Sequence, residues 1–505
     1  MTGNIFELLP NELLAHILAF LPVKFRITVV KLVCKRFYDV CQLQCVTDQD
    51  VFIYEDCHEE GCLEKIIEHY GGTRLHLRKS MIDTKTLERA LSMEQRLTSL
   101  AIYKTRLKGF NLNILRHHEL THLELNETGV CLGDIPTLPK LCVLNCVVSA
   151  NGESLSDIGR FKQLRRLTLN FRRSSVRPSS KLEHLPNLPD LSSLVIRDGY
   201  FWSGEQLKYL ARVPNLTSLD LSDTSSLDGL TYLPYLVKLA YLRLPYTQID
   251  DALNRCLNLT TLELPRIRNL QHLPALERLV CLCCHGYYDD YIGLPYLPNL
   301  RHLELKVDYQ FNRKTELNFE YLKQVPNLVT FTFTTSTQTI HLQHLPRLSR
   351  LIEANLFIRD MSIDLQELEK WSNLVVLRIP CTSYTSLNNL FPHMPHLEIL
   401  DVGMSIDCCE PWNFDTSDAL HALKHMIIRD HKLLEDSSNI TVSEKLSNRM
   451  FDDDDIVIER FLNFVGKSIY PTCREPCTLP RVKTEAEKLY DRARSIERSL
   501  YFLGI

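Results

Sequence analysis

A leucine pattern that recurs through most of the chain constrains its fold more than any other feature. The unit is L-x-x-L-x-L or a close variant. It begins at Leu97, Leu120, Leu141, Leu164, Leu191, Leu216, Leu239, Leu259, Leu276, Leu300, Leu328, Leu348, Leu374, Leu397 and Leu423. These fifteen starts span 326 residues, with a mean spacing near 23 and single intervals of 17 to 28. The alternation matches the two-residue period of a β-strand, which sends Leu219 and Leu221 to one face and Ser218 and Asp220 to the other. A single unit cannot bury its apolar face, so neighbouring units must stack.

This spacing is typical of leucine-rich repeats. We therefore predict an α/β fold in which a leucine-rich-repeat solenoid, a curved parallel sheet with convex helices or irregular turns, follows a helical N-terminus. Val51 to Tyr54 and Leu75 to Leu77 are expected to be strands of degenerate early repeats, with a convex helix from Cys62 to Tyr70 between them. No flexible linker is then needed between the first helices and the repeats.

The strand residues that point away from the leucine core should form the concave face of the solenoid. The predicted substrate-binding residues on this face are Glu124, Arg166, Arg197, Asp220, Tyr241, Arg243, Glu263, Arg278, Glu304, Arg350 and Arg378. Arginine and tyrosine supply directional hydrogen bonds and large contact areas, which favours a recognition surface. The alternative is that outward positions of any solvated sheet are polar, with no role in binding.

Arginines are densest in one part of this predicted face. The group consists of Arg166, Arg172, Arg173, Arg177 and Arg197. Guanidinium groups form strong, often bidentate hydrogen bonds with carboxylates and phosphates. The sequence therefore suggests that this part of the face binds an acidic or phosphorylated motif.

The first forty residues form a separate apolar segment. Pro10 suits the first turn of a helix, where its missing N–H costs nothing, and Glu12 places negative charge near the helix N-terminus. Apolar residues recur at helical spacing until Pro22 stops the run, and two more stripes follow, from Phe25 to Val33 and from Phe37 to Cys41. We expect three short helices. So small a unit carries more apolar surface than it can bury, which indicates a docking face.

The same segment resembles the F-box family. The resemblance rests on Leu9-Pro10-x-Glu12-Leu13-Leu14-x-x-Ile17-Leu18-x-x-Leu21-Pro22, followed by Val33-Cys34-Lys35-Arg36-Phe37-Tyr38. The family often has a tryptophan near this last aromatic pair, so the sequence departs from the pattern there. The resemblance implies a three-helix F-box whose adaptor-binding residues are Leu9, Pro10, Leu13, Ile17, Leu18, Leu21, Val33, Cys34 and Phe37. The alternative is a helical cap on the repeats.

Composition excludes several classes of function. A net charge of −4 with mixed signs gives no basic field for nucleic acid and no polybasic run for a membrane surface. The seventeen cysteines are scattered through apolar patterns, and none of their clusters has the paired C-x-x-C spacing of a structural zinc site. No phosphate loop, nucleophile elbow or H-E-x-x-H motif is present. We expect no metal, no cofactor and no catalytic residues, in a chain that is cytoplasmic, nuclear or both.

The repeat pattern fades after about residue 435. Ile440 to Val442 is expected to be one more strand, and the four acids Asp452 to Asp455 either form solvated surface or charge the N-terminus of a helix from Ile456 to Val465. An amphipathic helix is expected from Thr484 onward. The predicted domains are residues 1–48 for the F-box, 49–435 for the solenoid and 436–505 for a C-terminal cap or tail with amphipathic helices.

An F-box followed by leucine-rich repeats is the arrangement of substrate receptors in SCF-type E3 ubiquitin ligases. By resemblance, the N-terminus docks on the adaptor, and through it on cullin and RING subunits, while the solenoid holds a protein substrate. Such a chain is a non-catalytic receptor that contributes proximity. A non-degradative repeat scaffold shares these sequence features and stays open as the alternative.

Overall fold

The chain divides into two compact units, Met1–Arg460 and Phe461–Ile505, and all of the described residues lie in the first. The computed structural model describes residues 9–19, 30, 33–41, 43, 52–55, 73–78, 82–93, 97–107, 109–148, 153–171, 182–197, 204–224, 230–245, 251–267, 273–286, 294–307, 319–335, 344–358, 365–380, 391–403, 412–414, 425–429, 440–442 and 457–460. Neither the helix expected at 62–70 nor the one expected from 484 lies within these ranges.

The N-terminal segment contains the helices α2 (Asn11–Ala19) and α5 (Lys35–Cys41). As predicted, a helix starts here: α2 directly follows Pro10, whose carbonyl accepts a hydrogen bond of 3.0 Å from the N–H of Leu14. Six buried residues form a separate small core, with Phe37 packed against it. They are Leu14, Ala15, Leu18, Val30, Val40 and Cys41. Most of the second predicted helix lies outside the described residues.

The remaining described residues of the unit are dominated by one parallel sheet. The strands are β1 (Phe52–Glu55), β2 (Arg74–Arg78), β3 (Ser99–Tyr103), β4 (His122–Asn126), β5 (Val143–Val148), β6 (Arg166–Phe171), β7 (Ser193–Arg197), β8 (Ser218–Asp223), β9 (Tyr241–Arg243), β10 (Thr261–Ile267), β11 (Cys281–Gly286), β12 (His302–Val307), β13 (Thr330–Thr335), β14 (Glu353–Ile358), β15 (Val376–Pro380), β16 (Ile399–Gly403), β17 (Trp412–Phe414), β18 (His425–Arg429), β19 (Ile440–Val442) and β20 (Val457–Arg460). Eighteen of them form a single sheet, and β17 pairs with β19 in a second. Each strand of the large sheet pairs in parallel with the next strand of that sheet. The predicted solenoid is therefore confirmed, including its early strands β1 and β2.

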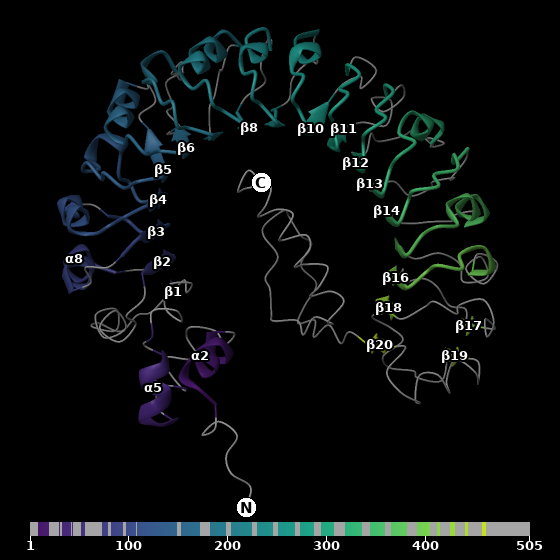
Figure 1. Cartoon of the computed structure of the whole chain (residues 1–505), viewed down its shortest axis with the longest axis horizontal. Helices are drawn as coiled ribbons and strands as arrows, with labels where there is room; N and C mark the ends of the chain where they lie inside the picture. The colour runs from purple at the N-terminus through teal and green to yellow at the C-terminus, as the bar shows by residue number, and fades with distance from the viewer. Residues whose placement is uncertain are drawn as a thin grey trace, which may run out of the picture. The chain divides into compact units, whose positions relative to one another are not determined.

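Short helices connect the strands. They are α8 (Thr84–Met93), η2 (Leu112–His117), η3 (Leu132–Asp134), η4 (Glu153–Arg160), η5 (Leu182–His184), η6 (Gly204–Arg212), η7 (Leu233–Tyr235), η8 (Asp251–Arg255), η11 (Glu320–Gln324), η12 (Leu365–Trp371) and η13 (Phe391–His393). In these described connections only α8 is an α-helix, and the others are 3-10 helices, which suit short connectors. Figure 1 shows the strands of the large sheet on the inner side of the curve and the connecting helices on its outer side.

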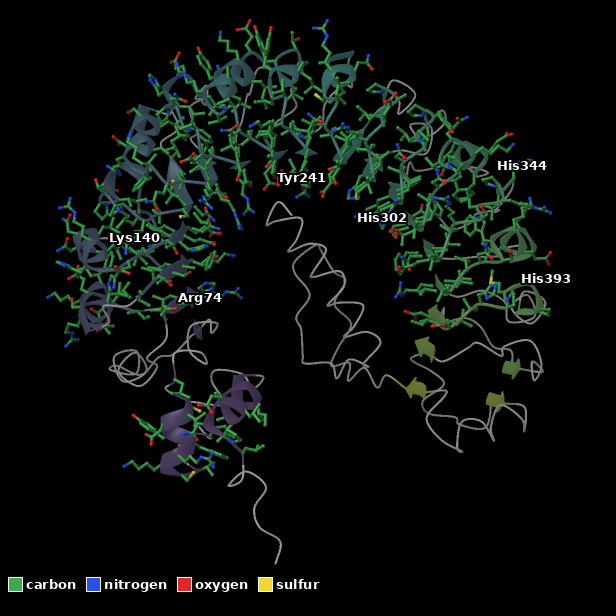
Figure 2. All side chains as sticks on the ribbon, in the orientation of Figure 1. Arg74, Lys140, Tyr241, His302, His344 and His393 are labelled. Atoms are coloured by element: carbon green, nitrogen blue, oxygen red, sulfur yellow. The ribbon has the colours of Figure 1, made fainter. Side chains whose placement is uncertain are left out.

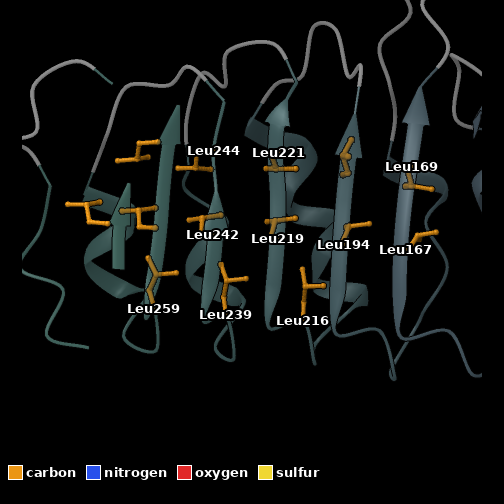
Figure 3. Packing of buried hydrophobic residues seen from close by; sticks show 14 of the residues in the cluster. Leu167, Leu169, Leu194, Leu216, Leu219, Leu221, Leu239, Leu242, Leu244 and Leu259 are labelled. Atoms are coloured by element: carbon orange, nitrogen blue, oxygen red, sulfur yellow. The ribbon is translucent and has the colours of Figure 1, made fainter. Parts of the chain in front are cut away.

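Leucines from successive repeats stack into one continuous core between the strands and the helices. Leu219 of β8 lies opposite Leu242 of β9, and both side chains are fully buried. Figure 3 shows this stacking for the repeats around β6 to β9. Because each leucine fills space beside the leucine of the next repeat, the pairing register and the core specify each other.

Two repeat starts predicted from the sequence are wrong. In the repeats assigned to Leu276 and Leu348, the strands begin five residues later, at Cys281 and Glu353, so the equivalent first leucines are Leu279 and Leu351. Leu279 lies 20 residues after Leu259 and 21 residues before Leu300, whereas Leu276 lies 17 and 24 residues from them. Each segment offers two leucines three residues apart, and only pairing with the adjacent strands selects the second.

The sheet continues past the part of the chain where the leucine pattern fades. Ile440–Val442 is a strand, as predicted. The helix predicted over residues 456–465 is wrong for Val457–Arg460, which form β20 and pair in parallel with β18. Pairing with an existing sheet edge outweighs the local helix signal of the preceding acids. Over the described parts of the chain, no helix is long and apolar enough to cross a membrane.

Candidate functional site

The first candidate surface is apolar and lies on the two N-terminal helices. Leu13 and Ile17 are four residues apart on one side of α2 and remain 51% and 43% exposed, whereas Leu14 on the neighbouring side is fully buried. Val33, just before α5, is 62% exposed, and Pro10 and Cys34 are also exposed. We name Pro10, Leu13, Ile17, Val33 and Cys34 the helix surface. Apolar side chains gathered at this exposure indicate an interaction site.

Arg36 ties α5 to the start of α2. Its Nε donates a hydrogen bond of 2.9 Å to Oδ1 of Asn11, and its Nη2 donates to the backbone carbonyl of Leu9. The Leu9-Pro10 turn is therefore held in place by a residue twenty-five or more positions later in the sequence. This contact fixes the turn next to the helix surface.

The structure places most of the predicted adaptor-binding residues on or beside the helix surface. Leu9 and Phe37 are half-buried, and Leu21 lies outside the described residues. The prediction that Leu18 belongs to the binding surface is corrected, because Leu18 is only 4% exposed and belongs to the small core. The sequence showed an apolar stripe too wide for one face, and packing against α5 assigns Leu18 to the inside. Tyr38, 43% exposed, is an additional apolar side chain that the prediction left out.

The second candidate surface is the strand face of the solenoid. Figure 2 shows Tyr241 and His302 on this inner side, and His344 and His393 on the outer side of the curve. In the middle of the face, Arg243 lies between two carboxylates contributed by the adjacent strands. Its Nη1 is 3.6 Å from Oδ2 of Asp220, and its Nε is 3.2 Å from Oε2 of Glu263. Three of the predicted substrate-binding residues are thus already paired with one another.

Tyr241 belongs to the same group. Its side chain is half-buried beside Glu263 and Asp220. Burial, followed by these two carboxylates, raises the pKa of Tyr241, because both disfavour a phenolate. Tyr241 is therefore a neutral side chain at physiological pH and can offer only hydrogen bonds or apolar contact.

A second charge group surrounds Arg378 on β15. Nη1 of Arg378 donates to Oε1 of Glu353 and, at 2.7 Å, to Oδ1 of Asn355, while its Nε lies 4.0 Å from Oδ2 of Asp401. The carboxylates of Glu353 and Asp401 are 7% and 6% exposed. Glu353 and Asn355 were not among the predicted substrate-binding residues, because their repeat was taken to start at Leu348. A repeat start at Leu351 would have placed both residues on the strand face.

Two predicted residues of the strand face are not on strands. Arg278 and Arg350 lie in exposed turns ahead of β11 and β14, and Nη1 of Arg278 donates a 2.7 Å hydrogen bond to Oδ1 of Asn258. Both errors follow from the misplaced repeat starts. The outward positions of β11 are taken instead by Cys281 and Cys283, and Sγ of Cys283 lies 3.8 Å from Oε2 of Glu304.

The other predicted residues lie toward the N-terminal strands. Glu124 on β4 accepts a hydrogen bond from the Tyr103 hydroxyl. Arg166 on β6 is half-buried, and Arg197 on β7 is exposed, with its Nε 3.7 Å from Oδ2 of Asp223. The remaining members of the predicted arginine group, at positions 172, 173 and 177, lie outside the described residues.

In the described part of the chain, no group of three or more histidine, cysteine, aspartate or glutamate side chains is arranged to hold a metal ion. Cys146 and Cys284 are fully buried in the leucine core, where they pack as small apolar residues. The two surfaces are suited to contact with other molecules.

The comparison with protein-family models bears on the N-terminal segment. Residues 6–44 match the family model described as F-box-like, which implies an SCF adaptor as a binding partner of this segment. No curated protein matches the chain. The chain thus joins an F-box-like segment to a leucine-rich-repeat solenoid, a fold whose extended concave surface serves protein interaction.

The chain is also similar to three solved structures at low identity. TLR13 in complex with ssRNA13 is 14% identical, with a TM-score of 0.40, over 80% of this chain and 61% of that chain. An internalin of Listeria monocytogenes is 15% identical, with a TM-score of 0.35, over 74% and 89%. A leucine-rich-repeat protein of Leptospira interrogans is 16% identical, with a TM-score of 0.38, over 81% and 100%. The present chain spans less than two thirds of the first.

Proposed function

We propose that this protein is the substrate-recognition subunit of an SCF-type cullin–RING ubiquitin ligase. In this proposal the F-box-like segment docks on the adaptor, and through it on cullin and RING subunits. The strand face of the solenoid binds a protein substrate. The chain performs no chemistry itself and acts by raising the effective concentration of the substrate near a ubiquitin-charged enzyme.

The observation that carries the proposal is the helix surface within the segment that matches the F-box-like model. Burying one leucine or isoleucine side chain contributes about 1.5–3 kcal/mol. Leu13, Ile17 and Val33 are already about half-buried, so covering the rest of each contributes roughly half of this value. A few such residues usually provide most of the energy of an interface. The fixed Leu9-Pro10 turn adds a rigid edge to it.

The direct test is co-purification of the full-length protein with adaptor and cullin. We expect Leu13→Glu combined with Ile17→Glu to abolish the association, because two charges would be buried in the contact. Both side chains are half-exposed or nearly so in the free protein, so the fold should survive. The pair Leu9→Ala with Pro10→Ala should weaken the association by removing the turn.

The matched control is Val237→Glu with Leu257→Glu, the same change at exposed apolar positions of the solenoid, which are 65% and 74% exposed. This variant should retain adaptor and cullin. Failure of the unaltered protein to co-purify with the adaptor contradicts the proposal, as does an equal loss in the control variant.

The degradative role needs a second measurement, since a non-degradative scaffold would use the same surfaces. Proteins captured by the unaltered chain should accumulate when the chain is depleted, and should lose ubiquitin in cells that carry only the Leu13→Glu, Ile17→Glu variant. Partners that bind but neither accumulate nor lose ubiquitin would assign the chain to the scaffold class.

A further inference from the structure

The charges of the strand face are divided unequally along the solenoid. From β8 to β16 the described face carries Arg243, Lys306 and Arg378 against a larger set of acids. These acids are Asp220, Glu263, Glu304, Glu353 and Asp401. Arg243 and Arg378 are each held between two of these carboxylates. The C-terminal half of the face is therefore net acidic, and two of its arginines are already engaged within the protein.

The N-terminal half has the opposite character. Strands β2 to β7 present four arginines and two histidines, which we name the basic surface: Arg74, His76, Arg78, His122, Arg166 and Arg197. The described acid within this half of the face is Glu124, whose carboxylate accepts the Tyr103 hydroxyl hydrogen bond. Arg197 also forms an ion pair with Asp223 on β8.

Three groups of the basic surface fall in one row across the strands. The pairing register runs from Arg74 through Ser99 to His122, and from His122 through Val143 to Arg166. Arg74, His122 and Arg166 are thus each two strands apart. With strands about 4.8 Å apart, neighbouring members of this row are separated by roughly 10 Å.

A second group lies further along β2 and β3. Arg78 is in register with Tyr103, and its guanidinium carbon is 5.8 Å from the centre of the Tyr103 ring. The ring of His76 meets Tyr103 edge-on, with 6.4 Å between the ring centres. Tyr103 is half-buried, and burial followed by Glu124 raises its pKa, so it stays neutral. Tyr103 therefore forms an uncharged floor between the arginines.

We propose that the basic surface binds an extended peptide segment of a partner protein through anionic groups, carboxylate or phosphate, spaced three residues apart. A chain in the extended polyproline II conformation advances about 3.1 Å per residue and completes one turn every three residues, so every third side chain points to the same side and recurs at about 9 Å, close to the roughly 10 Å spacing of the row formed by Arg74, His122 and Arg166. Arginine forms strong charge-assisted hydrogen bonds with either anion. This inference rests on the proposed function and assigns the substrate site to the N-terminal half of the face.

The location of His122 gives the binding a dependence on pH. His122 faces Arg166, Arg74 and Glu124, and its Nδ1 lies 2.8 Å from the Oγ1 of Thr121. Burial, followed by the two arginines, lowers the pKa of His122, so the ring is neutral in the free protein at pH 7. A bound anion favours the protonated ring, and binding should therefore strengthen as the pH falls from 8 to 6.

The test uses synthetic peptides and the full-length protein. The probe is a fluorescent nine-residue peptide with phosphoserine at positions 2, 5 and 8 and glycine elsewhere. Its comparison peptides carry glutamate or serine at the same positions, or three phosphoserines in succession. Fluorescence anisotropy should show the spaced phosphopeptide binding at least tenfold more tightly than the serine peptide and several-fold more tightly than the clustered one. Relative affinity of the glutamate peptide identifies which anion is preferred.

Arg74→Glu combined with Arg166→Glu should reduce binding of the spaced phosphopeptide by at least tenfold. The matched control is Arg116→Glu with Lys162→Glu, the same change of charge at exposed positions in η2 and in the turn before β6. It should stay within threefold of the unaltered protein. With the glutamate peptide, His122→Gln should remove most of the gain in affinity between pH 8 and pH 6.

Equal losses in the two charge-reversed variants would overturn the proposal, because they would indicate attraction to net charge alone. Equal affinity for the spaced and clustered peptides would overturn the assignment of the row, and tighter binding of a nine-nucleotide oligouridine would overturn the choice of a protein partner. Co-purification of adaptor with the Arg74→Glu, Arg166→Glu variant is measured in parallel. Retention of the adaptor with loss of the peptide separates this inference from the function of the helix surface.

Discussion

Replacing Arg378 by methionine should destabilise the solenoid strongly, although the residue lies on a solvent-facing sheet. The side chain of Arg378 is 21% exposed and neutralises Glu353 and Asp401, which are 7% and 6% exposed. Removing one partner of a buried ionic group costs about 3–5 kcal/mol, because the other charges stay buried and unpaired. We expect about 3 kcal/mol, the low end of this range, since Arg378 retains some contact with water.

The measurement is urea denaturation followed by tryptophan fluorescence; one of the three tryptophans, Trp371, lies in η12 directly before the strand that carries Arg378. Adding Glu353→Gln and Asp401→Asn to Arg378→Met should restore about half of the lost free energy, because the stranded charges are removed.

Arg166→Met is the control for this experiment. Arg166 forms no ion pair with a described residue, so its removal should change the free energy of unfolding by less than about 0.5 kcal/mol. A loss below about 1 kcal/mol for Arg378→Met, or an equal loss for Arg166→Met, would refute the view that the C-terminal arginines are structural.

Three further outcomes are expected. Trp371→Ala should lower the free energy of unfolding by about 3–5 kcal/mol, measured by urea denaturation followed by circular dichroism, because the ring is fully buried and its Nε1 donates to the Pro346 carbonyl. Burial, followed by the adjacent His117, lowers the pKa of His118 from 6.5. The unfolded chain therefore binds more protons at this residue, and the free energy of unfolding falls as the pH drops below about 6.5. The loss of that free energy between pH 7 and pH 5 should be smaller in His118→Leu. Burial raises the pKa of Cys146 to about 12, and mass spectrometry after native iodoacetamide treatment should find it unmodified while exposed Cys34 is alkylated.

The amino-acid sequence alone determined the repeat architecture. Leucines at a spacing near 23 residues, alternating with polar residues, can be buried only by stacking one strand per repeat, and this reasoning placed thirteen of the fifteen predicted starts in the correct frame. The start of α2 directly after Pro10 was equally local, because a missing N–H and a nearby acid act within one helical turn. The F-box-like model matches residues 6–44, the same segment that resembles the F-box in sequence.

Tertiary structure decided which of several locally equivalent residues perform each role. Leu276 and Leu279 fit the repeat pattern equally well until pairing with the neighbouring strands selects Leu279. Leu18 joins the small core while Ile17 stays exposed, because α5 packs on only one side of α2. Arg378 looks like any other outward arginine in the sequence, yet carboxylates from two neighbouring strands engage it. Such pairing depends on residues more than twenty positions apart, and only the register of the sheet brings them within hydrogen-bonding distance.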